Sequence, residues 1–554
     1  MNTFRLFFLA ALLTMACSST KNATTTSSTT NNSNSNAPDE IEAVVKAAEA
    51  DHNWHLESIA NSKYYGTETN RAYSELLANK TPTKKVIVAV IDSGTDIKHE
   101  DLAKNIWVNE DEIPDNGIDD DNNGYIDDIH GWNFIGGKNG ENVNKDSYEV
   151  SRLYKELSAK YADSDSATMA GDEEYELYLK VKADYNTKRN NALDAYDQLS
   201  NVKNAVNWAK TQLKISSLDS VDNAKIKVSN YDSPMLKQAK EIITFFTEKD
   251  INEEDIENEY NHYKDQVEYS YNEEFDPRHI VGDDYRDLTN RYYGNNDVTG
   301  PRSDHGTHVA GIIGAVRNNE LGTDGIADNI SLMIVRTVPD GDERDKDVAN
   351  AVRYAVENGA DVINMSFGKG YSPQKEYVDS AFKFADEQGV LVIHSAGNDG
   401  NNIDSVYTYP NKFYTDGGWS KNFITVGASS WKESSDSTLA ASFSNYGKTV
   451  DIFAPGVDVY STYPNNEYEK ASGTSMAGPV VTGVAALIMS YYPELTASDV
   501  KEILLQSATK INNTLVYKPG SKDVVDFSSL SATGGIVNAY EALKLAEIRA
   551  MGTK

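Results

Sequence analysis

Asp92, His305 and Ser475 are side chains of the types that carry out nucleophilic catalysis, and they occur in this order along the chain. A serine hydroxyl becomes a nucleophile when an imidazole takes its proton. The imidazole in turn needs a carboxylate that fixes its tautomer and stabilises its charge. Each residue alone has a commoner structural explanation, such as a helix cap or a turn. The combination predicts a hydrolytic site, provided that the fold brings the three side chains together.

The positions of the histidines exclude two other classes of hydrolase. All nine histidines lie at or before His394, so none follows Ser475 as the α/β-hydrolase order would require. Ala477 also occupies the place of the last glycine in the Gly-x-Ser-x-Gly turn of that class. The zinc-binding motif His-Glu-x-x-His is absent, because Ala103 stands where a second histidine would follow His99.

The residues around the three side chains indicate the elements that must position them. Residues 86–91 are apolar and mostly β-branched, which predicts a strand buried on both faces that ends at Asp92. Ser475 stands before the apolar stretch 480–489, at the beginning of a predicted helix whose dipole favours negative charge there. Residues 305–314 contain three glycines, which would let a helix approach its neighbours closely. These patterns predict an α/β fold with its site at the carboxyl ends of parallel strands.

Three segments resemble the signatures of the subtilisin-like serine proteases (subtilases, peptidase family S8). They are residues 90–94 (VIDSG), 305–311 (HGTHVAG) and 473–479 (GTSMAGP), in the order typical of that family. Gly478 is the one departure inside the third signature, where relatives often have serine or alanine. The resemblance covers residues 54–138 and 276–546. It implies a three-layer α/β fold with a mostly parallel central sheet flanked by helices, and a serine endopeptidase that works through an acyl-enzyme.

The resemblance also implies roles for residues outside the triad. Residues 395–398 (SAGN) match the segment that carries the oxyanion-hole asparagine of the family, here Asn398, whose amide would donate to the developing negative charge. Residues 364–368 match the substrate-binding strand, and the residues expected to contact a peptide are Ser366, Phe367 and Gly368. Thr408 precedes a Tyr-Pro pair and would lie near the floor of the P1 pocket. We expect a shallow, uncharged pocket for small to medium apolar P1 side chains.

Two groups of oxygen-bearing side chains are candidates for a structural Ca²⁺ ion. Residues 119–127 fit the first nine places of an EF-hand loop, with expected ligands at Asp119, Asp121, Asn123 and Asp127. The twelfth place is a histidine rather than a glutamate, and the alternative is a solvated acidic turn. The family resemblance implies a second calcium site at Asp101 and Asn319, in a loop one residue longer than usual. No catalytic metal is expected.

A long insertion separates the predicted aspartate and histidine segments. It occupies residues 139–275 and contains apolar residues at helical spacing, which predicts three to five helices joined by polar loops. One such stripe consists of Tyr196, Leu199, Val202, Val206, Ala209 and Leu213. Two interpretations remain open for this all-helical subdomain: it stabilises the catalytic domain by packing on it, or it forms a gate or docking surface beside the cleft.

The first residues resemble the export signal of a bacterial lipoprotein. Arg5 precedes the short apolar run 6–13, and Cys17 would become the lipid-bearing first residue after cleavage of residues 1–17. An ordinary signal peptide with an incidental cysteine is the alternative. Residues 18–38 are mostly serine, threonine and asparagine and would form a flexible tether.

The remaining boundaries follow from these segments. Residues 39–83 are expected to be largely helical and are either a cleaved propeptide or part of the mature domain. The catalytic domain comprises residues 84–138 and 276–546, and residues 547–554 form a tail.

Composition limits the partners of the protein. The chain has 554 residues, with 52 Lys and Arg against 85 Asp and Glu and a net charge of −33, which argues against nucleic-acid binding. Its single cysteine excludes an intramolecular disulfide. The resemblance to the subtilases implies peptide or protein substrates. The resemblance to a lipoprotein signal implies membrane attachment only through the N-terminal lipid, and a location at the bacterial cell envelope, on the outer membrane or the cell surface. The rival hypothesis is a catalytically silent envelope binding or scaffold protein on the same fold. Oligomeric state is not indicated.

Overall fold

The computed structural model describes residues 50–164, 168–218, 221, 226–431 and 437–552. The predicted signal peptide 1–17, the lipid site Cys17 and the tether 18–38 lie outside the described residues. The chain forms two compact units. The main unit comprises Glu49–Glu149 and Asp276–Lys554, and the described residues of the helical unit belong to Val150–Phe275.

The main unit is built on a nine-stranded sheet in the order β10-β13-β7-β6-β5-β4-β1-β3-β2. All neighbouring pairs are parallel except the antiparallel pair of β10 and β13. The predicted strand before Asp92 is β1, and it lies between β3 and β4 near the middle of the sheet. The strands are β1 (Val86–Asp92), β2 (Gly131–Asn133), β3 (Ile330–Arg336), β4 (Val362–Met365), β5 (Leu391–Ser395), β6 (Phe423–Ser429), β7 (Ile452–Pro455), β10 (Thr509–Lys510) and β13 (Gly535–Ile536).

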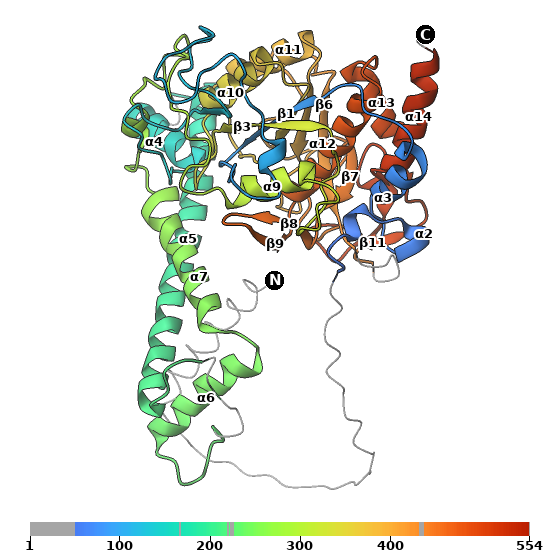
Figure 1. Ribbon diagram of the computed structural model, residues 1–554. Helices are drawn as coiled ribbons and strands as arrows, with labels where there is room; N and C mark the ends of the chain where they lie inside the picture. Colours follow the sequence, from blue (N-terminus) through green and yellow to red (C-terminus); the bar gives the residue numbers. More distant parts are fainter. Residues whose placement is uncertain (1–49, 165–167, 219–220, 222–225, 432–436, 553–554) are drawn as a thin grey trace. The chain divides into compact units, whose positions relative to one another are not determined.

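Helices cover both faces of the sheet because the strand residues are apolar on both sides. Val86, Val88 and Val90 belong to the same buried cluster as residues of α9, α12, α13 and α14, whereas Ala89 and Ile91 belong to the cluster of α10 and α11. Figure 1 shows β1 and β3 between these two layers. The helices are α9 (Asp304–Gly314), α10 (Asp345–Glu357), α11 (Lys375–Glu387), α12 (Thr474–Tyr491), α13 (Ala497–Gln506) and α14 (Ala539–Gly552). This arrangement confirms the predicted three-layer α/β fold.

α12 is the central helix of one layer. Its length and composition would suffice to cross a membrane, but 89% of its apolar window is buried inside the protein. It is therefore a core helix of the main unit. Two antiparallel hairpins complete this unit, β8 (Val459–Tyr463) with β9 (Glu467–Ala471), and β11 (Leu515–Tyr517) with β12 (Val524–Asp526).

The helical unit has its own hydrophobic core. The long helix α5 places Leu199, Val202 and Val206 in one buried cluster with Ile243 and Phe246 of α6. The elements are α4 (Glu149–Tyr161), α5 (Glu173–Leu213), α6 (Pro234–Glu248), α7 (Glu253–Asp265) and the π-helical turn η5 (Gln266–Ser270). The unit begins at Val150 rather than at residue 139. The residues before it pair with the main unit, as in the bridge between Lys145 and Asp340.

Residues 50–83 are part of the core of the main unit. They form η1 (Trp54–Leu56), α2 (Ile59–Ser62), α3 (Thr69–Arg71) and η2 (Ala72–Leu77). Trp54 and Leu56 are fully buried in the cluster that contains α12 and α14. The backbone N–H groups of Thr83 and Lys84 donate to the carbonyl of Ser490 in α12. Removal of this segment would therefore expose core side chains of the sheet layer.

We expect Trp54→Ala to lower the free energy of unfolding of the main unit by about 3–5 kcal/mol, because it removes a buried aromatic side chain and leaves a cavity. Urea unfolding followed by circular dichroism measures the change. Trp419→Ala is the matched control, since Trp419 is 63% exposed and its loss should change stability little. Equal unfolding midpoints for the two variants would contradict the assignment of residues 50–83 to the core.

Candidate active site

Asp92 and His305 meet at the carboxyl end of β1. The Nδ1–H of His305 donates to Asp92 Oδ1 at 2.7 Å, and the same oxygen accepts from the backbone N–H of Ser93 at 2.7 Å. Gly306 makes this approach of α9 to β1 possible, because a Cβ at that position would lie 2.1 Å from the carbonyl oxygen of Gly94. A glycine in the HGTHVAG segment is thus required by the close contact between helix and strand.

The environment of His305 adjusts its basicity. Partial burial of the imidazole favours its neutral form and would lower its pKa, but the Asp92 carboxylate outweighs this effect and raises the pKa above its ordinary value of 6.5. The side chain is 36% exposed, so its other face remains accessible. Because Nδ1 carries the proton of the hydrogen bond to Asp92, Nε2 of the neutral ring has a free lone pair.

His308, one turn further along α9, has a different role. Its Nε2 contacts the carbonyl oxygen of Glu469 at 3.0 Å, and burial lowers its pKa to about 4. His305 and His308 therefore bond to different partners, Asp92 and the carbonyl of Glu469, and do not share a ligand position. His308 is a neutral core residue that connects α9 to β9.

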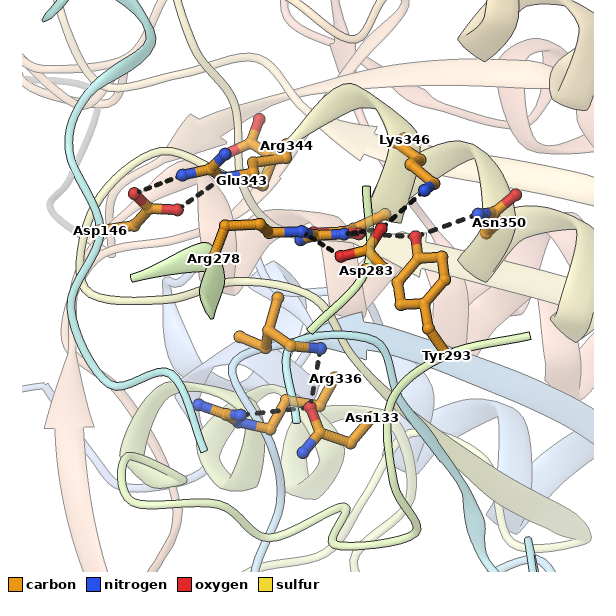
Figure 2. A network of polar contacts seen from close by, with 12 residues as sticks. Asn133, Asp146, Arg278, Asp283, Tyr293, Arg336, Glu343, Arg344, Lys346 and Asn350 are labelled. Carbon is orange, nitrogen blue, oxygen red and sulfur yellow. Dashed lines mark hydrogen bonds and ion pairs between the residues drawn. The ribbon is translucent and has the colours of Figure 1, made fainter. Parts of the chain in front are cut away.

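Arg336 supports the turn that follows Asp92, and sequence analysis did not identify it. It ends β3 directly beside Asp92, and its Nε donates to the carbonyl of Ser93 at 2.8 Å. Its other nitrogens donate to Asn133 Oδ1 at 3.2 Å and to the carbonyl of Val143 at 2.6 Å. Burial lowers its pKa to about 10. Figure 2 shows Arg336 beside Asn133. A charged residue at the end of an apolar strand is the sequence signal that could have revealed it.

Ser475 is the second residue of α12, and it is joined to the predicted substrate-binding strand. Its hydroxyl donates to the carbonyl of Ser366 at 3.1 Å, and the Ser366 hydroxyl donates to the carbonyl of Ser475 at 3.0 Å. No hydrogen bond joins Ser475 to His305 within the described part of the chain. Such a contact is often long in a free enzyme and tightens only when substrate binds.

Asn398 lies next to the start of α12 with its amide orientation fixed. Its Oδ1 accepts from the backbone N–H of Thr474 at 2.8 Å and from the Thr474 hydroxyl at 2.9 Å, which leaves Nδ2 as the exposed donor end. A Cβ on Gly473 would lie 3.6 Å from both Asn398 Nδ2 and the backbone nitrogen of Ser475. Two donor nitrogens thus lie equally near the position where a side chain on Gly473 would begin. No sequence pattern had indicated the positioning role of Thr474.

The predicted substrate-binding residues form one segment after β4. The carbonyl of Phe367 contacts Nε2 of the buried His394 at 2.8 Å, which holds this peptide from behind. Gly368 lies close to Tyr409, since a Cβ on the glycine would be 3.1 Å from the Tyr409 carbonyl oxygen. Thr408 is half-buried and precedes the cis peptide bond between Tyr409 and Pro410. The structure therefore brings the strand and the segment that contains Thr408 side by side.

The acidic loop has a different set of neighbours from the one expected. Carboxylate oxygens of Glu112, Asp119 and Asp121 all lie within 4.8 Å of one another. Asp127 instead accepts from the backbone N–H groups of Asn116 and Gly117, at 3.1 and 2.9 Å. The Asn123 side chain donates to Asp121. Glu112 lies before the EF-hand-like stretch, so only the folded loop reveals it as a member of the group.

Asp101 and Asn319 also lie together, in a hydrogen-bonded arrangement. Asn319 Nδ2 donates to Asp101 Oδ1 at 2.7 Å, and the Asn319 Oδ1 accepts from the backbone N–H of Leu321. The Asp101 carboxylate also accepts from Tyr468 and Thr323. Burial raises the pKa of Asp101. Its contacts are thus hydrogen-bond donors, as are those of Glu112 in the acidic loop, which accepts from three backbone N–H groups.

Comparison with known proteins connects this geometry to one family. The family model described as the subtilase family matches residues 83–523. Subtilisin DY from Bacillus licheniformis is 39% identical over 220 residues, which cover 39% of this chain and 74% of that protein. Subtilisin NAT from Bacillus subtilis subsp. natto is 38% identical over 222 residues, which cover 39% of this chain and 54% of that protein.

A solved structure is also similar in part. The structure described as "Structural basis of subtilase cytotoxin SubAB assembly" matches 45% of this chain and 78% of its own chain. The sequence identity is 22% and the TM-score is 0.38, too low for an argument about this chain.

Proposed function

This chain belongs to the subtilase family of serine peptidases, and on that premise we propose that it is a serine endopeptidase that uses Asp92, His305 and Ser475. The observation that carries the proposal is the 2.7 Å hydrogen bond between the buried Asp92 carboxylate and His305 Nδ1. This contact leaves Nε2 unprotonated in the neutral ring, which is the state that a general base needs.

The proposed reaction begins with proton transfer from Ser475 to His305. The Ser475 oxygen attacks the scissile carbonyl while Nε2 of His305 takes its proton, and Asp92 stabilises the resulting imidazolium. His305 then gives this proton to the leaving amine, and the first product departs. Water attacks the acyl-enzyme with His305 again as the base, which releases the second product and restores Ser475.

Asn398 and the backbone N–H of Ser475 are proposed to stabilise the negative charge on the substrate oxygen. Support comes from the position of the two donor nitrogens, each 3.6 Å from the place where a Cβ of Gly473 would lie. The Thr474 contacts hold the amide so that its nitrogen, not its oxygen, is free. Donors fixed in place before the reaction need no reorganisation as the charge develops.

An extended peptide is proposed to pair with residues 366–368 as an added strand. Two backbone carbonyls of the segment already have fixed partners, because the Ser366 carbonyl accepts from the Ser475 hydroxyl and the Phe367 carbonyl contacts Nε2 of His394. Thr408 provides an uncharged pocket floor, and we propose a preference for small to medium apolar P1 side chains.

The acidic loop is proposed to bind a structural Ca²⁺ ion through Glu112, Asp119 and Asp121. Three carboxylates within 4.8 Å repel one another unless a cation neutralises them. Hard oxygen ligands of this kind suit Ca²⁺. The ion would stabilise the loop and takes no part in the reaction.

Export, lipid attachment and maturation complete the proposal. We propose that the protein is exported and attached to the envelope through a lipid on Cys17, a proposal supported by the sequence of residues 1–38. Residues 50–83 are proposed to remain in the mature enzyme, because their buried side chains belong to its core.

We expect a fluorophosphonate to label the protein at Ser475 and the label to be lost in Ser475→Ala. Ser442→Ala is the control, since Ser442 is exposed and should leave labelling unchanged. Asn398→Ala should lower kcat by about 10²–10³-fold, the loss known for the corresponding donor of subtilisin. Absence of labelling in the folded wild-type protein would instead support a catalytically silent binding protein.

The pH dependence of kcat/KM should report the ionisation of His305. Activity needs the neutral imidazole, so kcat/KM rises with pH through an inflection above 6.5, the ordinary pKa that Asp92 raises. In Asp92→Asn the carboxylate is lost while burial remains, and the inflection should move to lower pH. Residual activity of the variant is measured against Glu100→Gln, an exposed acidic control. An unchanged inflection in Asp92→Asn would contradict the assigned pair.

Calcium binding should stabilise the protein and should depend on Glu112. At free Ca²⁺ 100 times the Kd, the free energy of unfolding increases by about 2.7 kcal/mol per site. Calorimetric titration of Glu112→Gln should find one Ca²⁺ ion fewer per chain, whereas Asp111→Asn, an exposed neighbour, should retain it. Equal stoichiometry in wild type and Glu112→Gln would rule out the acidic loop as the site.

A further inference from the structure

Lys369 follows directly after the substrate-binding segment 366–368, and its ammonium group is buried. The side chain is 1% exposed. A buried charge costs several kcal/mol unless it is paired and hydrogen-bonded. A buried lysine beside a substrate-binding strand must therefore have partners that offset this cost.

Three acceptors surround the Lys369 ammonium. Nζ lies 2.8 Å from Glu149 Oε2, 2.8 Å from Asp345 Oδ1 and 2.8 Å from the carbonyl oxygen of Glu343. These contacts use all three donor positions of an ammonium group. Burial alone would lower the pKa of Lys369, but the Asp345 and Glu149 carboxylates raise it above its ordinary range. The group is thus a permanent cation held at a fixed point.

The backbone of Lys369 connects the substrate-binding segment 366–368 to the segment of Thr408 and Tyr409. These two segments are the proposed walls of the P1 pocket. Its N–H donates to the carbonyl of Tyr409 at 2.8 Å, and the N–H of Tyr409 donates to the carbonyl of Lys369 at 2.9 Å. Tyr409 is the neighbour of Thr408, the proposed pocket floor. The position of Lys369 therefore determines how far the strand lies from the floor.

The Lys369 contacts belong to a buried charge network at the ends of the helical unit. Glu149 is the last residue of the main unit before that insertion, and Asp276 is the first one after it. Arg344 joins both sides, since it pairs with Asp146 at 2.7 Å and with Asp276 at 2.8 Å. Figure 2 shows Arg344 with Asp146.

The first turn of α10 extends the same network. Asp347 and Asp283 both pair with Arg278, at 2.6 and 2.5 Å, and Lys346 pairs with Asp283 at 2.6 Å. Figure 2 shows Arg278, Asp283 and Lys346 together. Asp345, the partner of Lys369, begins this helix. Lys369 thus contacts the first junction directly through Glu149, whereas its link to the second runs along the chain from Asp345 to Arg344, whose partner Asp276 is 60% exposed.

We propose that Lys369 is a positioning and specificity-determining residue, whose ion pairs with Glu149 and Asp345 set the spacing of the P1 walls. The selection of P1 side chains then depends on the junction where the helical unit joins the main unit. This proposal rests on the proposed peptidase function. It does not involve the triad or Asn398, none of which contacts the Lys369 ammonium among the described residues.

The test compares the rate of fluorophosphonate labelling, which does not need the P1 walls, with the cleavage of peptide substrates, which does. In the full-length protein, Lys369→Met should raise KM about 10-fold and change the ratio of kcat/KM between alanine and leucine P1 substrates, because a small displacement of the walls misplaces the peptide. The rate of fluorophosphonate labelling should stay within about threefold of wild type. Lys240→Met is the matched control, since Lys240 also pairs with a carboxylate and a backbone carbonyl, in the helical unit.

Glu149→Gln provides a second variant that keeps the lysine and its Asp345 contact. It should change KM in the same direction as Lys369→Met by a smaller factor. The double variant Lys369→Met/Glu149→Gln should recover part of the KM change, because the buried Glu149 side chain, which loses its Lys369 contact, is then neutral.

Three results would overturn the inference. They are wild-type KM and P1 ratios in a folded Lys369→Met, an equal effect of Lys240→Met, and a parallel loss of labelling and peptide cleavage in Glu149→Gln. Failure of the wild-type protein to react with the fluorophosphonate would instead refute the peptidase function itself.

Discussion

The hydrogen bond between Asp92 and His305 depends on how closely α9 approaches the end of β1. That approach is possible because Gly306 has no side chain to meet the backbone of Gly94. The strand supplies the other half of the constraint, since it is buried on both faces and fixed between β3 and β4. Arg336 then holds the turn after Asp92 from the neighbouring strand. The position of the carboxylate is thus determined by the sheet, and the orientation of the imidazole is determined by the carboxylate.

A second layer of the structure consists of buried charges rather than apolar contacts. Arg278, Lys346 and Lys369 have exposed fractions of 7% or less, and each has carboxylate partners that are also buried. Ion pairs of this kind contribute little net stability, but loss of one partner is costly because the other charge remains buried. Their geometric effect is to fix the two chain junctions of the insertion on the main unit.

The sequence predicted the fold well where local pattern and burial agree. The apolar run 86–91 became β1, and the apolar stretch after Ser475 became the core helix α12. Prediction was incomplete where partners come from distant segments. Glu112 joins Asp119 and Asp121 only after the loop folds back, and Asp127 turns to cap backbone N–H groups. Residues 39–83 offered two interpretations in sequence, and the burial of their described part, 50–83, depends on α12 and α14, which follow hundreds of residues later.

The chemical types, their order and the elements that carry them can be read from the amino-acid sequence, because motif residues and hydrophobic periodicity are local properties of the chain. It was sufficient to predict the Asp, His and Ser positions and the resemblance to one family. Only the tertiary structure decided which nitrogen of His305 meets Asp92, which end of the Asn398 amide is free, and which carboxylates surround Lys369. These are distances between residues far apart in the chain. They follow from close packing of helices on the sheet and from the need to pair every buried charge.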